Sequence, residues 1–489
     1  MRGFEYRGVI EGFYGPPWAH ADRLWMLERM AGWGMNLYVY APKNDPLHRD
    51  RWREPYPDDQ MREFRELVSR GDSLGVGVGF AISPGLSIEY ASSDERAALS
   101  GKFESFRDLG ARFLSLALDD VPSRLLHDAD RETFGSLAEA HAVLVEHLRK
   151  RIGGDVTLWF VPTDYVGVAP SPYLEELGER LDPEVEIAWT GRTIVSPTIR
   201  ADEAARRAAM VRRPLLLWDN VPVSDGPMRS MLHLGPYGGR EPGLRAHARG
   251  VLLNPMEHAR ASAVTIGTAA RFLDDPEGYE PERAWKEVLR EVGTGAPEAF
   301  ATFAEAHRFH PIWPDAQEAE LAAALADLRR EFARGGDPIR RVEEIQELVQ
   351  TRVACHGCLR EGLDDARLKA EITPWLESYA RETERIATTL DGLKGVLGGG
   401  TAAERCTAFL GFGVRVNRRA AAVAQSYGPR RVYYPQIVSM GDDTMALGED
   451  PAVFRDRCLA DQFVELFEEV ATERLRSPSY PGFPRKSPD

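Results

Sequence analysis

The 489-residue sequence has few cysteines, no excess of basic residues and no long hydrophobic run. Its four cysteines include one close pair, Cys355 and Cys358, in a helix-like stretch without a second pair. We interpret them as ordinary reduced thiols rather than as a redox-active pair or half of a zinc site. Lysine and arginine number 61 against 76 acidic residues, and the net charge of −15 argues against nucleic acid or an anionic membrane as main partner. No apolar stretch could span a bilayer and no signal peptide opens the chain, so we expect a cytoplasmic protein.

The first 275 residues read as alternating strands and helices. Short apolar runs alternate with amphipathic stretches, as a parallel α/β sheet requires. Eight such units predict a (β/α)8 TIM barrel, which typically takes about 250 residues. An open doubly wound sheet is the alternative, but no glycine-rich dinucleotide fingerprint follows the first strand. The expected strands are residues 6–11, 35–41, 76–82, 111–118, 156–161, 185–190, 214–218 and 249–253. The expected helices include Asp22–Trp33, Asp58–Leu74, Asp94–Leu109, Arg131–Ile152 and Asp202–Val211.

From about residue 280 the pattern changes to helices alone. A chain of this length is too long for one core, so we expect a catalytic barrel (1–275), an all-α helical bundle (280–476) and a disordered tail (477–489). A long irregular segment at 430–450 is expected to approach the functional site. Apolar stripes in the bundle are interpreted as core, with a homodimer surface as the alternative. The stripes are Leu321, Leu325 and Leu328; Val342, Ile345 and Val349; and Leu368, Ile372, Trp375 and Tyr379.

Asp119 and Asp120 end the apolar run that begins at Ala111. A buried strand that stops in two carboxylates is typical of the catalytic end of an α/β barrel. Two carboxyl groups so close do not both ionise freely, so we expect one of them to hold a proton near neutral pH. The pair therefore offers an acid and a base side by side, although aspartate is also common in turns and helix caps.

Polar and aromatic residues follow the other predicted strands as well. The carboxyl ends of barrel strands meet on one face, so these residues should lie together. An aromatic platform, amides, hydroxyls and paired carboxylates are what a sugar site requires. The residues in question are Lys43 after the second strand, and then Tyr165, Thr190, Trp218, Asn220 and Asn254.

These stretches resemble glycoside hydrolase family 84, which contains the protein O-GlcNAcases and related β-N-acetylglucosaminidases. The resemblance covers the whole predicted barrel in order and departs from the family pattern at Asn44, where aspartate is usual. Beyond about residue 280 it extends only to a helical domain. The matching stretches are Gly8–Gly15, Tyr40–Lys43, His48–Arg49, Trp52–Glu54, Ala81–Gly85, Leu118–Asp120, Pro162–Tyr165, Trp189–Gly191, Leu217–Asn220 with Asp225, and Leu234–Tyr237.

The resemblance implies a role for each matching residue. Asp119 resembles the carboxylate that orients and polarises the substrate's 2-acetamido group, and Asp120 resembles the general acid/base. Tyr165 is similar to the residue that positions the acetamido oxygen, and Trp218 to a wall of the acetamido pocket. The residues implied to hydrogen-bond the GlcNAc are Gly12 (through its backbone), Lys43, Asn220, Asp225 and Asn254.

The adjacency of the two aspartates supports this interpretation independently. An ordinary retaining glycosidase places its two carboxyls about 5 Å apart across the bond, and an inverting one about 6.5–9.5 Å. Neighbours on one strand end are poorly placed to flank a sugar in that way. If the substrate's own acetamide attacks the anomeric carbon, no protein nucleophile is needed. Paired aspartates also bind divalent metals, but the surrounding aromatic and amide residues fit a sugar better, so we expect neither metal nor cofactor.

The leading hypothesis is a retaining exo-β-N-acetylglucosaminidase acting on a GlcNAc-bearing glycoprotein, glycopeptide or glycan. Two alternatives remain open at this stage. One is an endo-acting hydrolase of chitin-like or hyaluronan-like chains. The other is a non-catalytic module that binds GlcNAc or glycopeptides, against which the intact aspartate pair argues.

Overall fold

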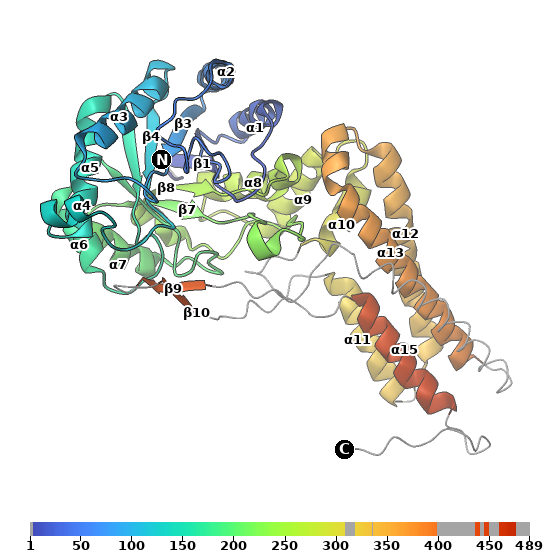
Figure 1. Cartoon of the computed structure of the whole chain (residues 1–489). Helices are drawn as coiled ribbons and strands as arrows, with labels where there is room; N and C mark the ends of the chain where they lie inside the picture. Colours follow the sequence, from blue (N-terminus) through green and yellow to red (C-terminus); the bar gives the residue numbers. More distant parts are fainter. Residues whose placement is uncertain are drawn as a thin grey trace.

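A computed structural model of the chain describes residues 3–308, 318–334, 336–398, 436–440, 445–448 and 459–475. Its N-terminal part is a closed barrel of eight parallel strands in sequential order, with helices around it (Figure 1). The predicted TIM barrel is confirmed. The strands are β1 (Tyr6–Glu11), β2 (Leu37–Tyr40), β3 (Gly77–Ile82), β4 (Phe113–Ala117), β5 (Thr157–Val161), β6 (Glu186–Trp189), β7 (Leu215–Asp219) and β8 (Ala248–Leu253).

The strands form where apolar residues are buried on both faces of the sheet. One set of side chains fills the inside of the barrel, including Ile10, Val39 and Ala117, while a larger set packs outward against the helices. Burial on both faces explains why these strands read as continuous apolar runs in the sequence. The barrel closes where β1 pairs with β8, with Gly8 opposite Leu252.

Helices follow the strands and cover the outer face of the barrel. Residues visible in the sequence mark some of their ends. Helix α2 is followed by Gly75, whose φ of 72° is a left-handed conformation that glycine adopts without strain. The barrel helices are α1 (His20–Gly32), α2 (Asp58–Leu74), α3 (Ser93–Asp108), α4 (Asp128–Thr133), α5 (Leu137–Ile152), α6 (Pro172–Arg180), α7 (Ala201–Val211) and α8 (Ala259–Asp274). Short 3-10 turns are η1 (Gly226–Met228) and η2 (Pro242–Ala246).

The single helix predicted over Arg131–Ile152 is wrong, because the chain forms two helices there. Helix α4 stops at Thr133 and α5 begins at Leu137. Between them, Ser136 adopts extended backbone and its side chain accepts a hydrogen bond from the Glu139 backbone N–H. Glu139 in turn accepts from the Gly135 N–H. This arrangement is close to a capping box, whose serine and glutamate spacing was visible in the sequence.

After α8 the described residues form helices and one small hairpin, and helices α11, α12, α13 and α15 extend away from the barrel (Figure 1). The predicted apolar stripes are buried as core, the first two in the distal cluster and the last one against the barrel. The helices are α9 (Pro281–Val292), α10 (Pro297–Ala306), α11 (Ala319–Arg334), α12 (Pro338–Gly362), α13 (Ala366–Leu397) and α15 (Leu459–Leu475), and the hairpin strands are β9 (Gln436–Met440) and β10 (Met445–Gly448).

Helix α13 contacts the loops that follow β7 and β8. Trp375 donates its indole N–H to the carbonyl of Ser230 at 2.9 Å. The carboxylate of Glu371 accepts from the backbone N–H groups of Arg260 and Ala261 at 3.1 and 2.9 Å. Since these are orphan donors in the first turn of α8, Glu371 caps that helix from another part of the chain. The helical part therefore supports two loops at the carboxyl end of the barrel.

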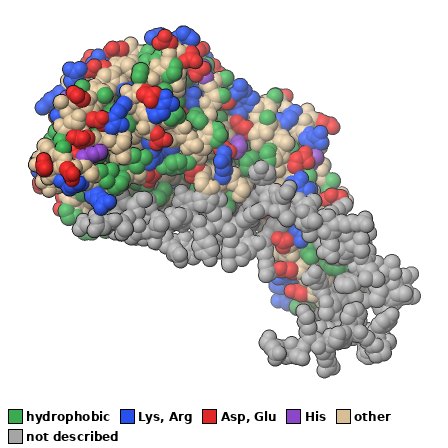
Figure 2. All heavy atoms as spheres, in the orientation of Figure 1, with side chains coloured by type: hydrophobic (Ala, Val, Ile, Leu, Met, Phe, Trp, Pro, Cys, Tyr) green, Lys and Arg blue, Asp and Glu red, His purple; other side chains and the backbone are tan. Residues whose placement is uncertain are grey.

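Several other expectations concern the surface and the C-terminal region. Acidic and basic side chains are interspersed over the visible face of the barrel (Figure 2). None of the helices in the described part of the chain is long and apolar enough to cross a membrane.

Of the 430–450 segment only β9 and β10 are described, so its expected approach to the site stays a prediction. The expected tail at 477–489 lies outside the described residues, and the domain boundary near 275–280 stays a prediction.

Candidate active site

One cavity opens at the carboxyl end of the barrel strands. It encloses about 670 Å³ of empty space, including its opening to solvent. All ten residues predicted from the sequence line this cavity. They are Gly12, Lys43, Asp119, Asp120, Tyr165, Thr190, Trp218, Asn220, Asp225 and Asn254.

Asp119 forms a buried ion pair with Lys43. The ammonium nitrogen lies 2.5 Å from Asp119 Oδ2, and the two residues are 7% and 5% exposed. Lys43 also lies over the Trp218 ring, 5.4 Å from its centroid. The second oxygen of Asp119, Oδ1, is buried and has no hydrogen-bond partner among the described residues. A buried acceptor of this kind is costly unless a donor reaches it, so the cavity is suited to a ligand N–H or O–H at this point.

Asp120 is held by two tyrosines. The hydroxyl of Tyr14 donates to Asp120 Oδ2 at 2.8 Å, and that of Tyr165 donates to Oδ1 at 2.7 Å. Burial, and then the charge of Asp120, raise the pKa of both tyrosines well above the ordinary value. Both hydroxyls therefore keep their protons at working pH and remain donors. The two neighbouring aspartates thus have different surroundings: a cation for Asp119 and two neutral hydroxyls for Asp120.

An amide network joins β1, β7 and β8 at the base of the cavity. Asn220 Oδ1 accepts from Trp218 Nε1 at 3.0 Å and from Asn254 Nδ2 at 2.9 Å. Asn254 Oδ1 accepts from the backbone N–H of Gly12 at 3.2 Å. Any side chain at position 12 would collide with Trp218, because a Cβ there would lie 2.3 Å from the indole ring. The network fixes the Trp218 ring as a flat wall.

Asp225 and Thr190 complete the predicted set. Asp225 Oδ2 accepts from the Tyr14 backbone N–H at 2.9 Å, and burial raises the pKa of the Asp225 carboxyl. Thr190 donates its hydroxyl and its backbone N–H to the carbonyl of Tyr165, at 3.3 and 3.0 Å, so it holds the Tyr165 backbone in place. Asn44 is exposed and lies outside the cavity lining, so the departure from the family pattern does not alter the cavity.

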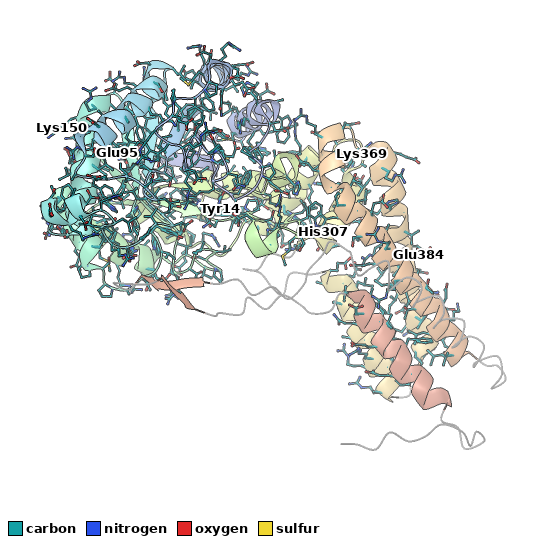
Figure 3. The ribbon with its side chains drawn as sticks, in the orientation of Figure 1. Tyr14, Glu95, Lys150, His307, Lys369 and Glu384 are labelled. Atoms are coloured by element: carbon teal, nitrogen blue, oxygen red, sulfur yellow. The ribbon has the colours of Figure 1, made fainter. Side chains whose placement is uncertain are left out.

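Four further residues line the cavity without having been assigned a role from the sequence: Tyr14, Val161, Ile194 and Val223. Tyr14 belongs to a matching motif, but nothing in the sequence indicated that it reaches Asp120. In Figure 3 it lies toward the centre of the molecule, whereas Lys150 on α5 lies at the outer edge. His48 is buried nearby, and burial together with Lys43 lowers its pKa to about 3, so it is neutral and is no acid/base candidate.

The described residues contain no group of three or more His, Cys, Asp or Glu side chains arranged to hold a metal ion. Cys355 is buried and donates to the carbonyl of Ala299 at 3.0 Å, while Cys358 is exposed. Both are free thiols. Neither lies at the cavity.

Comparisons with known proteins agree with this architecture. A family model described as β-N-acetylglucosaminidase matches residues 7–305. The protein O-GlcNAcases of Rattus norvegicus and Mus musculus are each 35% identical over 271 residues, which is 54% of this chain and 29% of each mammalian protein. The chain thus matches less than a third of the length of these curated relatives.

Two solved structures are similar over most of the chain. A mutant of the Thermobaculum terrenum O-GlcNAc hydrolase superposes with a TM-score of 0.82 at 29% identity, covering 96% of this chain and 95% of that one. The structure of CpGH84B has a TM-score of 0.77 at 24% identity, covering 87% of this chain and 74% of that one, and supports the fold alone.

Proposed function

The chain belongs to the β-N-acetylglucosaminidase family of glycoside hydrolases, family 84, and we propose that it is an exo-acting, retaining enzyme that removes terminal β-linked GlcNAc. We further propose that the substrate's 2-acetamido group is the nucleophile. The single observation that carries this proposal is that the two adjacent aspartates have different partners. One is paired with a buried lysine and the other is held by two tyrosine hydroxyls.

The surroundings of Asp119 suit a carboxylate that binds the acetamide. Its ion pair with Lys43 fixes one carboxylate oxygen and leaves the other facing the cavity. Its unpartnered oxygen Oδ1 is the natural acceptor for the acetamide N–H. Holding that N–H pushes electron density toward the carbonyl oxygen and stabilises the positive charge that develops on the group as it reacts.

The chemistry then proceeds in two steps. In the first, the acetamide oxygen bonds to the anomeric carbon, the glycosidic bond breaks, and protonated Asp120 gives its proton to the departing oxygen. The product is an oxazolinium ion whose N–H remains on Asp119. In the second step Asp120 removes a proton from water, which attacks the anomeric carbon and reopens the ring. Two inversions retain the configuration, and no protein nucleophile is required.

The rest of the cavity supports recognition of one sugar. Trp218 offers a flat apolar face for the acetyl methyl, and the Tyr165 hydroxyl, which donates to Asp120 here, would donate to the acetamide oxygen instead once the substrate is bound. Asp225, Asn254 and the Gly12 backbone offer polar groups for sugar hydroxyls. The convergence of these residues on one pocket at the end of the barrel supports recognition of a single terminal sugar, and therefore exo action.

We propose O-GlcNAc on serine or threonine of proteins as one substrate, because the relatives over the barrel are protein O-GlcNAcases and an O-GlcNAc hydrolase. Homodimer formation through the helical part and a cytoplasmic location remain predictions. The endo-acting and non-catalytic alternatives are separated from the proposal by product analysis.

An aryl β-GlcNAc, an O-GlcNAc peptide and a chitin oligomer should be incubated separately with the enzyme and the products identified by mass spectrometry. We expect free GlcNAc from the first two, and from chitin at most single residues lost from the non-reducing end. An Asp120→Asn variant serves as the control for contaminating hydrolases. Internal cleavage of chitin would favour the hypothesis of an endo-acting hydrolase. Tight binding of all three compounds without any product would favour the hypothesis of a non-catalytic binding module.

A further inference from the structure

Arg49 is linked to Asp120 by one direct hydrogen bond and by one that passes through Tyr14, although Arg49 and Asp120 come from different loops. Arg49 lies in the segment between β2 and α2, and Asp120 lies three residues after the end of β4. The guanidinium Nη2 donates to the backbone carbonyl of Asp120 at 3.2 Å. Its Nη1 donates to the hydroxyl of Tyr14 at 2.8 Å, and that hydroxyl donates to the Asp120 carboxylate at 2.8 Å. One side chain thus holds the main chain of Asp120 directly and its carboxyl group through Tyr14.

The backbone of Asp120 needs such support. Its φ is 53°, in the left-handed region, where a residue with a Cβ is less stable than in the ordinary regions. The conformation turns the Asp120 carboxyl into the cavity immediately after Asp119. A strained conformation persists only when surrounding contacts hold it. The Arg49 hydrogen bond to the Asp120 carbonyl is such a contact.

Arg49 differs from its neighbour Arg53 in the partners of its guanidinium group. Within the described residues its guanidinium forms no salt bridge with a carboxylate, and its side-chain partners are a neutral phenol and a carbonyl. Arg53, four residues further along the same segment, makes an ion pair with Glu95 and donates to Ser87. The positive charge of Arg49 is therefore left to act on the catalytic pair, whereas that of Arg53 is neutralised at the surface.

We propose that Arg49 is a positioning residue for the general acid/base, acting on Asp120 through its carbonyl and through Tyr14. The inference rests on the proposed function, since it takes Asp120 to be the proton donor. Arg49 holds the carboxyl group of Asp120 in line with the departing oxygen through these two contacts. Arg49 itself is not among the residues that line the cavity.

The test uses aryl β-N-acetylglucosaminides with leaving groups from dinitrophenol to unsubstituted phenol, and measures kcat/KM against leaving-group pKa. Misplacing a catalytic group by about 1 Å costs about a hundredfold. Arg49→Met should therefore lose about tenfold to a hundredfold on phenol but little on dinitrophenol, because only the poor leaving group needs the proton. Arg49→Lys should recover part of the loss, since an ammonium can make one of the two contacts. Arg53→Met, the matched control, should keep the wild-type slope.

A merely structural role would reduce all substrates alike, so an equal loss across the series overturns the proposal, as does an unchanged slope in Arg49→Met. In the Asp120→Asn background, Arg49→Met should add no further leaving-group dependence, because the group that it positions is gone. If Arg49→Met does not fold, as judged by thermal unfolding, the slopes of Arg49→Lys and Tyr14→Phe decide the question. Absence of GlcNAc release by the wild-type enzyme would instead reject the proposed function itself.

Discussion

Asp120→Ala should lose most of its activity on an O-GlcNAc peptide or an alkyl glycoside while it still breaks the bond of an activated aryl glycoside. Loss of a general acid typically costs about 10²–10⁴-fold, and the cost falls as the leaving group becomes able to depart without a proton. Because the same residue must activate water in the second step, hydrolysis of the intermediate should then limit turnover. A burst of aryl alcohol followed by a slow steady state is the expected signature.

The measurement is bond-cleavage rate against leaving-group pKa for Asp120→Ala and the wild type. The expected plot is steep for the variant and shallower for the wild type. The Asp120→Ala variant should still fold, since the Asp120 side chain that it truncates is only partly buried. A shallow slope in Asp120→Ala, with an equal loss on every substrate, contradicts its assignment as the general acid.

Asp119→Ala should slow cleavage of good and poor substrates alike. Its carboxylate stabilises charge on the acetamide whatever the leaving group, and removing one such electrostatic contact typically costs about 10²–10³-fold. A steep leaving-group dependence in this variant would mean that the roles of the two aspartates are reversed. The rate is best measured with the same aryl series, so that the slopes of both variants are compared directly.

Stability must be monitored for Asp119→Ala, because its partner Lys43 is buried. Removing one member of a buried ion pair leaves an uncompensated charge and typically costs 3–5 kcal/mol. Asp119→Asn keeps the shape and a hydrogen-bond acceptor but removes the charge. If both variants are folded at the assay temperature and show the same flat loss, the effect belongs to the chemistry rather than to unfolding.

The barrel was predictable from the sequence because its strands are buried on both faces. Residues 111–118 were expected as a strand, and β4 spans Phe113–Ala117. Continuous apolar runs of this kind leave little ambiguity about a parallel strand. The helix over Arg131–Ile152 was mispredicted because helical spacing continues across the break, while the turn depends on the local contact between Ser136 and Glu139.

The cavity was predictable for a related reason, since barrel topology brings every strand's carboxyl end to one face. That rule predicts that Lys43, Asp119 and Asn254 lie close together, and it does so without any knowledge of their contacts. It does not say which side chains touch. The hydrogen bond from Tyr14 to Asp120 and that from Arg49 to Tyr14 join residues 106 and 35 positions apart through loops. Loop conformation leaves no periodic signal in the sequence, so these contacts required the structure.

The central claim is that the substrate supplies its own nucleophile, and varying the acyl group tests it most directly. The wild-type enzyme should be assayed with aryl glycosides bearing acetyl, fluoroacetyl, difluoroacetyl and trifluoroacetyl groups on the sugar nitrogen, and with the aryl β-glucoside. Each fluorine weakens the carbonyl oxygen as a nucleophile, so kcat/KM should fall steadily along the series. The glucoside should be about 10⁵-fold slower or inert, since a well-placed intramolecular nucleophile reaches effective molarities of that order. Equal rates along the series, or a glucoside cleaved as fast as the GlcNAc compound, would contradict substrate assistance.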